Sequence, residues 1–417
     1  MSPPDVLIIG AGLAGLTCAR HLHRAGIATQ LLEASNDIGG RIRSDNLGGY
    51  TLDRGFQVLL TAYPEAQRQL DYDRLNLHSF YNGALIRFDG RFHRMADPFR
   101  HLLDATGTIL SPIGTFKDKF RVARLRTDLV EGTLRDLFAR EEMTTDSALR
   151  ERYHFSDNII DRFFRPFFGG IFFDKELRTS SRMFDFVFRM FALGSEALPA
   201  TGMQAIPRQI AAALPDKVIR LNTLVAAVDH TTVHLENEEP LSVAAVVIAT
   251  EAPVASRLLG VEASVGHNST TCLYYAADTL PEEDPILILN GEGEGPINNV
   301  NLLSNVVPSY APEDKALLSV TLIGDPEIPD DTLESQVRRQ LAEWFGPEVG
   351  TWRHLTTYRI AYALPDQAPP FLARRERPPR RRPGLYVCGD HLATASINGA
   401  LRSGRCAAEA VLEDLNV

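Results

Sequence analysis

The sequence predicts an α/β fold built around a parallel sheet, and three observations near its start predict it. Residues 5–9 form a short apolar run that is typical of a buried strand. The next residues have the glycine spacing G-x-G-x-x-G, and an apolar helix pattern covers residues 13–24. A second predicted strand, residues 28–32, ends at an acidic residue. Strand, glycines, helix, strand and acid in this order predict a Rossmann-type unit that binds a dinucleotide.

Each glycine of this motif has its own physical task. Gly10 permits the tight turn, Gly12 lets the backbone approach a pyrophosphate, and Gly15 lets the helix pack closely on the strand. The helix N-terminus directs free N–H groups toward the phosphates. Glu33 stands near the spacing at which an acid accepts a hydrogen bond from a ribose hydroxyl, which disfavours a phosphorylated nicotinamide cofactor. The predicted contacts here are Gly10, Gly12, Leu13, Ala14, Gly15, Glu33 and Ala34.

Two further segments carry glycine and charge in informative positions. Residues 38–43 read Ile-Gly-Gly-Arg-Ile-Arg, so Gly40 allows a tight turn and Arg41 offers a guanidinium to phosphate oxygens. Near the other end, an apolar strand leads into Gly389 and Asp390, and a helix pattern covers residues 396–404.

These three segments resemble the FAD-dependent amine-oxidase superfamily, which includes monoamine oxidases, protoporphyrinogen oxidases and phytoene (carotenoid) desaturases. The resemblance implies that the first motif holds the ADP half of FAD and that the terminal segment faces the ribityl chain and the flavin. It also implies that residues 50–57 return toward the flavin ring. The contacts that the resemblance adds are Gly40, Arg41, Val225, Thr250, Gly389, Asp390, Ser396, Ile397 and Asn398. Neither Cys388 nor Cys406 matches the motif that links flavin covalently in monoamine oxidases, so we expect non-covalent FAD.

The bulk composition limits the function classes. The length of 417 residues allows two domains, and the net charge of −10 argues against nucleic-acid binding. Four cysteines without C-x-x-C spacing favour reduced thiols and a cytoplasmic protein. The first strand begins directly after Met-Ser-Pro-Pro, which leaves no room for a signal peptide, and no run of 18 apolar residues predicts a membrane span. Membrane contact is therefore expected to be peripheral at most.

The domain arrangement is predicted to be discontinuous. The resemblance assigns residues 1–80, 200–262 and 383–417 to the FAD-binding domain, and 81–199 and 263–382 to an α+β substrate domain with a mixed sheet and a helical cap. The pattern predicts helices at 64–70 and 332–345, and a mainly helical stretch over 98–213 with N-caps at Ser156 and Ser180. It predicts a hairpin at 84–94 that turns at Asp89-Gly90. The remaining predicted strands are 243–248, 269–277, 286–289, 297–303, 316–323 and 352–362.

A phenylalanine-rich stretch is the second informative region. Eleven of the 21 phenylalanines fall within residues 155–191, and we expect about half of them in the helical core. Residues 163–173 resemble the Phe-x-x-Pro…Gly-Gly-Ile segment of protoporphyrinogen oxidases and carotenoid desaturases, which belongs to the substrate domain there. Aromatic walls with few charges suit a large apolar or conjugated substrate.

Several alternatives stay open at this stage. Monoamine-type oxidases use a lysine near the flavin, and the matching strand at 271–278 has none, although Tyr274, Tyr275, Tyr358 and Tyr362 could form an aromatic cage. His391 is either a proton acceptor or a partner for a backbone carbonyl. No catalytic residue is identified, and no histidine spacing predicts a metal. The alternatives to desaturation are amine or amino-acid oxidation, polyene isomerisation, or a flavin-binding assembly factor without turnover.

Two more segments bear on partners. Residues 291–295 read Gly-Glu-Gly-Glu-Gly, and their carboxylates would repel phosphate, so we interpret them as a hairpin loop. Without a second dinucleotide site, the expected electron acceptor is oxygen, a quinone or the product of another enzyme. The basic run 374–382 is expected to be a solvated linker, with contact to anionic lipid as the alternative, and residues 91–101 mix basic and aromatic residues in the same way.

Overall fold

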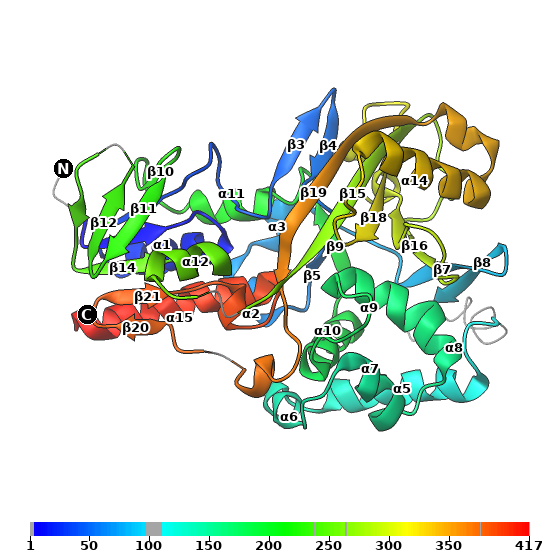
Figure 1. The fold of residues 1–417 in the computed structure, drawn as a ribbon, viewed down its shortest axis with the longest axis horizontal. Helices are drawn as coiled ribbons and strands as arrows, with labels where there is room; N and C mark the ends of the chain where they lie inside the picture. Colours follow the sequence, from blue (N-terminus) through cyan, green and yellow to red (C-terminus); the bar gives the residue numbers. More distant parts are fainter. Residues whose placement is uncertain (1–3, 97–110, 237, 263–264, 376, 417) are drawn as a thin grey trace.

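A computed structural model describes residues 4–96, 111–236, 238–262, 265–375 and 377–416. Two large sheets lie side by side, and a layer of helices lies below the second sheet in the view of Figure 1. The long strands β15 (His267–Ala277) and β19 (Arg353–Pro365) extend from the second sheet toward the first (Figure 1). Among the described residues, no helix is long and apolar enough to cross a bilayer.

The first sheet has six strands in the order β10-β2-β1-β14-β21-β20. Five of them run parallel, and β20 joins antiparallel at the edge. The strands are β1 Val6–Ile9, β2 Thr29–Leu32, β10 Ile219–Arg220, β14 Ala245–Ile248, β20 Arg380–Arg382 and β21 Leu385–Val387. Strands β1, β14 and β21 are buried along their whole length, as parallel strands between helices require. The predicted α/β fold is therefore confirmed.

Helix α1 (Leu13–Arg24) packs against the C-terminal helix α15 (Ile397–Leu415) beside this sheet (Figure 1). The contact is so close that a Cβ atom on Gly404 would lie 2.2 Å from the carbonyl oxygen of Ala14. Glycine at position 404 thus allows the two ends of the chain to meet. Helix α12 (Ala252–Leu259) follows β14 and packs near β11.

The second sheet has seven strands in the order β19-β15-β18-β17-β16-β7-β8. The other strands are β7 Gly83–Phe88, β8 Arg91–Ala96, β16 Leu287–Asn290, β17 Asn299–Asn301 and β18 Ala316–Ile323. The β7–β8 hairpin turns at Asp89 and Gly90, both with positive φ, as predicted for a type I′ turn. Strands β16 and β17 pair antiparallel, which confirms that residues 291–295 form a hairpin loop.

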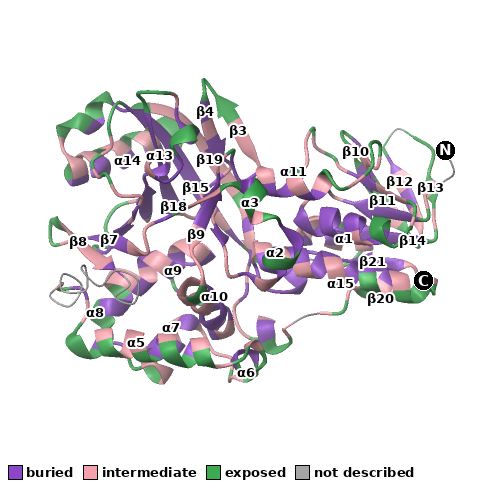
Figure 2. Cartoon of the chain, turned by 180° about the vertical axis from the view of Figure 1, so that it is seen from behind, coloured by how far each residue is buried: buried purple, intermediate pink, exposed green. Residues whose placement is uncertain are grey.

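Helices cover both faces of this sheet. Helix α14 (Asp330–Phe345) packs on one face, where it meets alternate residues of β15 and β18. The opposite face meets the phenylalanine-rich helices α9 (Arg165–Phe172) and α10 (Ser181–Leu193). Six of the eleven phenylalanines of that region are buried, which confirms the expectation for about half: Phe155, Phe164, Phe168, Phe172, Phe184 and Phe186. Figure 2 shows this buried layer between sheet and helices.

The remaining elements are shorter. They are β3 Ser44–Leu47, β4 Tyr50–Asp53, β5 Leu59–Leu60, α2 Pro64–Gln69, α3 Tyr72–Leu75, β6 Leu77–Ser79, α5 Phe116–Glu131, α6 Leu134–Ala139, α7 Thr145–Ser147, α8 Asp157–Ile159, β9 Glu196–Pro199, α11 Ala205–Ala211, β11 Val225–Asp229, β12 Thr232–Leu235, β13 Leu241–Ser242 and α13 Leu303–Val306. Strand β9 pairs with β5 and β6, so one strand interrupts the stretch predicted to be helical.

Some sequence-based expectations differ from the structure. Ser180 caps α10 through its side chain, but the Ser156 hydroxyl donates to Asp118 instead of capping α8. The predicted strand 297–303 ends at residue 301, because α13 begins at 303. Strand β20 belongs to the first sheet, although we assigned 380–382 to the substrate domain, because its backbone pairs with β21. The start of the predicted helical stretch, 98–110, lies outside the described residues.

A buried acidic residue links the β3–β4 hairpin to the seven-stranded sheet. Asp53, at the end of β4, accepts hydrogen bonds from the Ser44 hydroxyl, the Met203 N–H and the Tyr310 hydroxyl, and its carbonyl oxygen accepts from Tyr274. None of these donors is a cation, so burial dominates and raises the pKa of Asp53 to about 6. The charged form of Asp53 is therefore destabilised in the folded protein.

This raised pKa predicts a pH-dependent stability. The pKa of Asp53 is higher in the folded than in the unfolded protein. The protonated carboxyl group therefore makes its full contribution to the free energy of unfolding below about pH 4, and this contribution is lost as the pH rises through about 6. Between about pH 4 and pH 8 we expect the unfolding free energy of the wild type to fall by about 3 kcal/mol relative to Asp53→Asn. Urea unfolding at several pH values measures this difference. A difference that is independent of pH would contradict the prediction.

Candidate functional site

A cavity of about 720 Å³ lies where the two sheets meet. Its first half is lined by loops that follow the carboxyl ends of β1, β2, β14 and β21. Strand β1 lies between β2 and β14, so the strand order changes direction at β1. In open α/β sheets, ligands bind at the carboxyl ends of the strands beside such a point. The second half is lined by α9, α10 and strands of the seven-stranded sheet.

The glycines of the first motif have the geometry that a phosphate loop needs. Gly10 has a φ of +104°, which other residues rarely adopt. A Cβ on Gly15 would lie 1.9 Å from the Gly10 carbonyl oxygen, whereas a Cβ on Gly12 would meet no protein atom within 4 Å. Gly12 is therefore open toward the cavity, and Gly15 closes the turn. Gly40 approaches from the other side, since its Cβ would lie 3.3 Å from Gly12 Cα.

Glu33 lines the cavity directly after β2. Its carboxylate accepts from the Ala11 N–H at 2.7 Å and from the N–H and hydroxyl of Ser35. These contacts fix the carboxylate beside the glycine turn, where the resemblance expects a ribose. A hydrogen bond between Glu33 and a ribose hydroxyl stays a prediction.

Arg41 and Asp390 form an ion pair across the cavity wall. The guanidinium donates to Asp390 Oδ1 at 2.8 Å and to the Ala363 carbonyl at 2.8 Å. Asp390 is only 4% exposed at its side chain, and Arg41 is 31% exposed. Burial opposes the charge of Arg41, but Asp390 outweighs it and the pKa of Arg41 is raised. The pair joins residues 349 positions apart, from the glycine-rich segment and the terminal segment.

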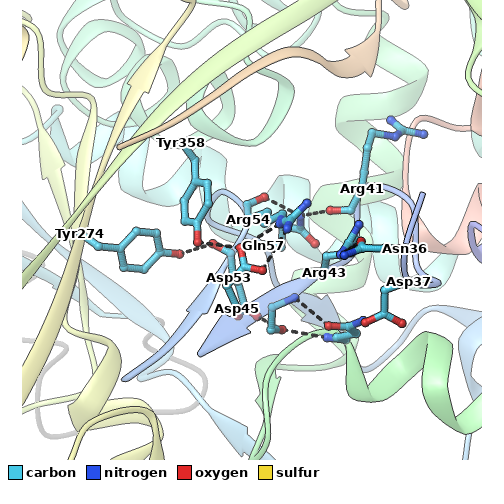
Figure 3. Close-up of polar contacts among 12 residues, drawn as sticks. Asn36, Asp37, Arg41, Arg43, Asp45, Asp53, Arg54, Gln57, Tyr274 and Tyr358 are labelled. Carbon is cyan, nitrogen blue, oxygen red and sulfur yellow. Dashed lines mark hydrogen bonds and ion pairs between the residues drawn. The ribbon is translucent and has the colours of Figure 1, made fainter. Parts of the chain in front are cut away.

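The loop after β4 adds a fixed amide. The Gln57 side chain donates from Nε2 to the carbonyl oxygens of Arg41 at 2.7 Å and Arg54 at 3.1 Å (Figure 3). Its Oε1 lies buried in the cavity wall without a partner among the described residues. A buried acceptor is usually satisfied, so this atom fits a ligand donor. The open glycine turn and this acceptor fit a dinucleotide such as FAD.

The structure brings most of the predicted site residues together. Those that line the cavity are Gly10, Gly12, Leu13, Ala14, Glu33, Ala34, Gly40, Arg41, Val225, Thr250, Gly389, Asp390, Ser396 and Ile397. Gly15 lies behind the turn and acts through packing. Asn398 does not line the cavity either, because its Oδ1 accepts from the Glu65 N–H at 2.9 Å and so joins α15 to α2. Contacts with FAD by these residues stay predictions.

Among the polar cavity residues that the sequence analysis did not single out are Glu251 and Asn299, whereas Gln57 lies in the segment 50–57 that was expected near the flavin ring. Glu251 directly follows Thr250 at the end of β14, so its position at a strand end was an available signal. Burial raises its pKa, and the charge of Arg41 partly offsets this. Asn299 had no local signal, since it reaches the cavity only through strand pairing.

The second half of the cavity is an apolar chamber. Its lining from the helices is Pro166, Phe167, Gly170, Ile171, Phe173, Met183, Val187 and Phe191, and from the strands it is Thr270, Leu287, Leu289, Asn299, Ile360, Ala363 and Leu364. We call these residues the chamber. No member carries a charge, and Asn299 and Thr270 are its polar side chains. Thr270 donates its hydroxyl to the Leu322 carbonyl, which leaves Asn299 as the member with an unpartnered N–H among the described residues.

The aromatic cage considered for amine oxidation does not form here. None of the four strand tyrosines lines the cavity. Tyr274 donates to the Asp53 carbonyl at 2.6 Å and Tyr358 donates to Asp45 at 2.8 Å, so both hydroxyls hold the β3–β4 hairpin (Figure 3). No lysine is present among the described cavity residues.

His391 and the cysteines lie outside the cavity lining. Burial lowers the pKa of His391 to about 4, so its ring is neutral at pH 7, and its Nδ1 has no partner among the described residues. The backbone partner expected for this ring is not seen at Nδ1. Burial raises the pKa of Cys388 to about 12. Among the described residues, no group of three or more His, Cys, Asp or Glu side chains could hold a metal.

Comparisons with known proteins place this geometry in context. The family described as flavin containing amine oxidoreductase matches residues 13–412. Human lysine-specific histone demethylase 2 is 51% identical over 56 residues, which are 13% of this chain and only 7% of that protein. A candidate protoporphyrinogen oxidase from Exiguobacterium sp. 255-15 matches with a TM-score of 0.74 at 19% identity, over 100% of both chains. Cyclohexylamine oxidase from Brevibacterium oxydans IH-35A matches with a TM-score of 0.74 at 16% identity, also over 100% of both chains. At these identities the structural matches show the shared fold.

Proposed function

This chain belongs to the flavin-containing amine oxidoreductase family and is an FAD-dependent oxidoreductase, and we propose that it removes hydride from a large apolar or conjugated substrate. The single observation that carries the proposal is the uncharged chamber, which is continuous with the dinucleotide half of the cavity. A carotenoid- or isoprenoid-like molecule, or a porphyrinogen, has the apolar surface that such a chamber can bury.

FAD, when bound, would supply the redox chemistry as a hydride acceptor. The residues of this chain bind and orient both molecules. The glycine turn and Arg41 are suited to the diphosphate, and the loop at 54–58 also lines the cavity. The chamber walls exclude water and hold the apolar skeleton. We assign no catalytic base, since no acid, lysine or histidine is among the described chamber residues.

We propose that FAD is held without a covalent bond, because none of the four cysteines lines the cavity. We also propose oxygen or a quinone as the electron acceptor, since the chain carries no second glycine-rich dinucleotide motif.

Anaerobic bleaching of the flavin tests the substrate class. The purified holoprotein is mixed in turn with a carotenoid in liposomes, with protoporphyrinogen and with a panel of amines, and the flavin absorbance is followed. Bleaching by a polyene or porphyrinogen supports the proposal. Bleaching by amines alone would overturn it, and a flavin that isomerises a polyene without net bleaching would favour isomerase activity.

Amine oxidation is the second candidate, because cyclohexylamine oxidase shares the whole fold. The chamber offers no carboxylate to an ammonium group, which argues against a cationic substrate. An amine would therefore have to enter as the neutral base.

We further propose peripheral membrane contact, and we place it on α5. One face of this helix carries Phe116 and Phe120, which are 70% and 71% exposed, beside Lys117, Arg121 and Arg124. Exposed aromatic rings with neighbouring cations suit the surface of an anionic bilayer. The segment suggested by sequence is less suitable: Phe92 packs on Trp344 and Phe345, Arg94 pairs with Asp284, and residues 97–101 lie outside the described part.

The double variant Phe116→Ser/Phe120→Ser is expected to bind anionic vesicles about tenfold or more weakly, because it lacks the two rings that would be buried in the bilayer. Co-sedimentation with phosphatidylglycerol vesicles measures it, with phosphatidylcholine vesicles as the uncharged comparison. Leu47→Ser, at a residue 45% exposed on the distant β3–β4 hairpin, is the matched control and should bind as the wild type does. Equal binding by all three proteins would contradict the α5 site.

A further inference from the structure

The amide of Asn299 is an unsatisfied donor in an otherwise apolar chamber. Asn299 begins β17 and is 4% exposed. Its cross-strand partner in β16 is Leu289, which also lines the chamber. The Asn299 Nδ2 has no hydrogen-bond partner among the described residues. Buried polar groups without a partner are rare, and each asks for an explanation.

The orientation of this amide is fixed by its neighbour. Asn298 donates from Nδ2 to Asn299 Oδ1 at 2.8 Å and to the Pro166 carbonyl at 3.0 Å. The oxygen of Asn299 is thereby occupied, so the N–H groups are what remains for a ligand. Gly170 makes room for this pair, because a Cβ there would lie 2.6 Å from Asn298 Nδ2. Helix α9 and strand β17 thus hold the donor at the chamber wall.

We propose that Asn299 is a specificity-determining residue that donates a hydrogen bond to an acceptor oxygen on the substrate. This inference rests on the proposed function and narrows it. The substrate class is an apolar skeleton that carries a carbonyl, ether or hydroxyl oxygen at the end that reaches β17. A pure hydrocarbon leaves the donor unpaired, and an ammonium group cannot accept a hydrogen bond.

The test compares the affinity of two ligands that differ only in this acceptor. An isoprenoid ketone and the hydrocarbon of the same carbon skeleton are titrated into the FAD-loaded protein by calorimetry. The wild type should bind the ketone about tenfold more tightly than the hydrocarbon, the size of one buried hydrogen bond. Asn299→Leu and the isosteric Asn299→Asp should bring this ratio close to one, because neither variant keeps the amide donor.

Asn301→Leu is the matched control. Asn301 is the same residue type, buried on the same short strand, and it does not line the cavity. This variant should keep the preference for the ketone, which separates the hydrogen bond from general damage to β17. Equal binding of both ligands by the wild type, or an unchanged ratio in both Asn299 variants, would overturn the inference alone. Failure of both ligands to bind would overturn the apolar-substrate proposal and the inference with it.

Discussion

Replacing Gly15 with alanine is expected to abolish FAD binding and to lower the free energy of unfolding by more than about 3 kcal/mol. The added Cβ would lie 1.9 Å from the Gly10 carbonyl oxygen. That atom belongs to the backbone of a turn between a buried strand and helix α1, so it cannot rotate away as a side chain can. The turn must open, and the N–H groups of the helix then no longer point into the cavity.

Gly12→Val is the informative companion variant. A Cβ at this position meets no protein atom within 4 Å, and its φ of −73° suits any residue. The free energy of unfolding of the FAD-free variant should therefore equal that of the wild type. The affinity for FAD should fall by about 100-fold or more, because the valine side chain occupies the path of the pyrophosphate. Flavin absorbance after gel filtration and urea unfolding measure the two quantities. Wild-type FAD affinity in Gly12→Val would contradict the assignment of this turn to the cofactor.

Replacing Arg41 with methionine is expected to lower the free energy of unfolding by about 2–3 kcal/mol at pH 8. The guanidinium is the only side chain recorded within hydrogen-bond distance of the Asp390 carboxylate among the described residues. Without it, a nearly buried carboxylate stays unpaired, which is costly away from water. Urea unfolding of the wild type and the variant at pH 8 measures the loss.

The double variant Arg41→Met/Asp390→Asn isolates this effect. It removes the charge that the single variant leaves unpaired, so it should be more stable than Arg41→Met at pH 8. Urea unfolding at pH 8 compares the two variants. A single variant as stable as the wild type at pH 8 would show that water in the cavity solvates Asp390 adequately.

The local parts of this fold were predictable because each depends on residues close together in sequence. The turn after β1 needs glycine at positions 10 and 15 for steric reasons that involve only the neighbouring strand and helix. The Asp89-Gly90 turn needs positive φ at both residues, which the dipeptide itself provides. The resemblance added the distant contacts, and the structure places Thr250 and Asp390 at the same cavity as Gly10.

The amino-acid sequence by itself thus determined the βαβ unit, the glycine turn, the hairpin and an apolar substrate region. Only the tertiary structure decided which phenylalanines face the chamber, that Asn398 bonds to α2 instead of facing the cavity, and that Asn299 lines the chamber. The physical reason is the distance along the chain. Motifs are set by sterics within one turn or strand, whereas the chamber arises from strand register and helix packing between segments more than a hundred residues apart, such as Pro166 and Asn298.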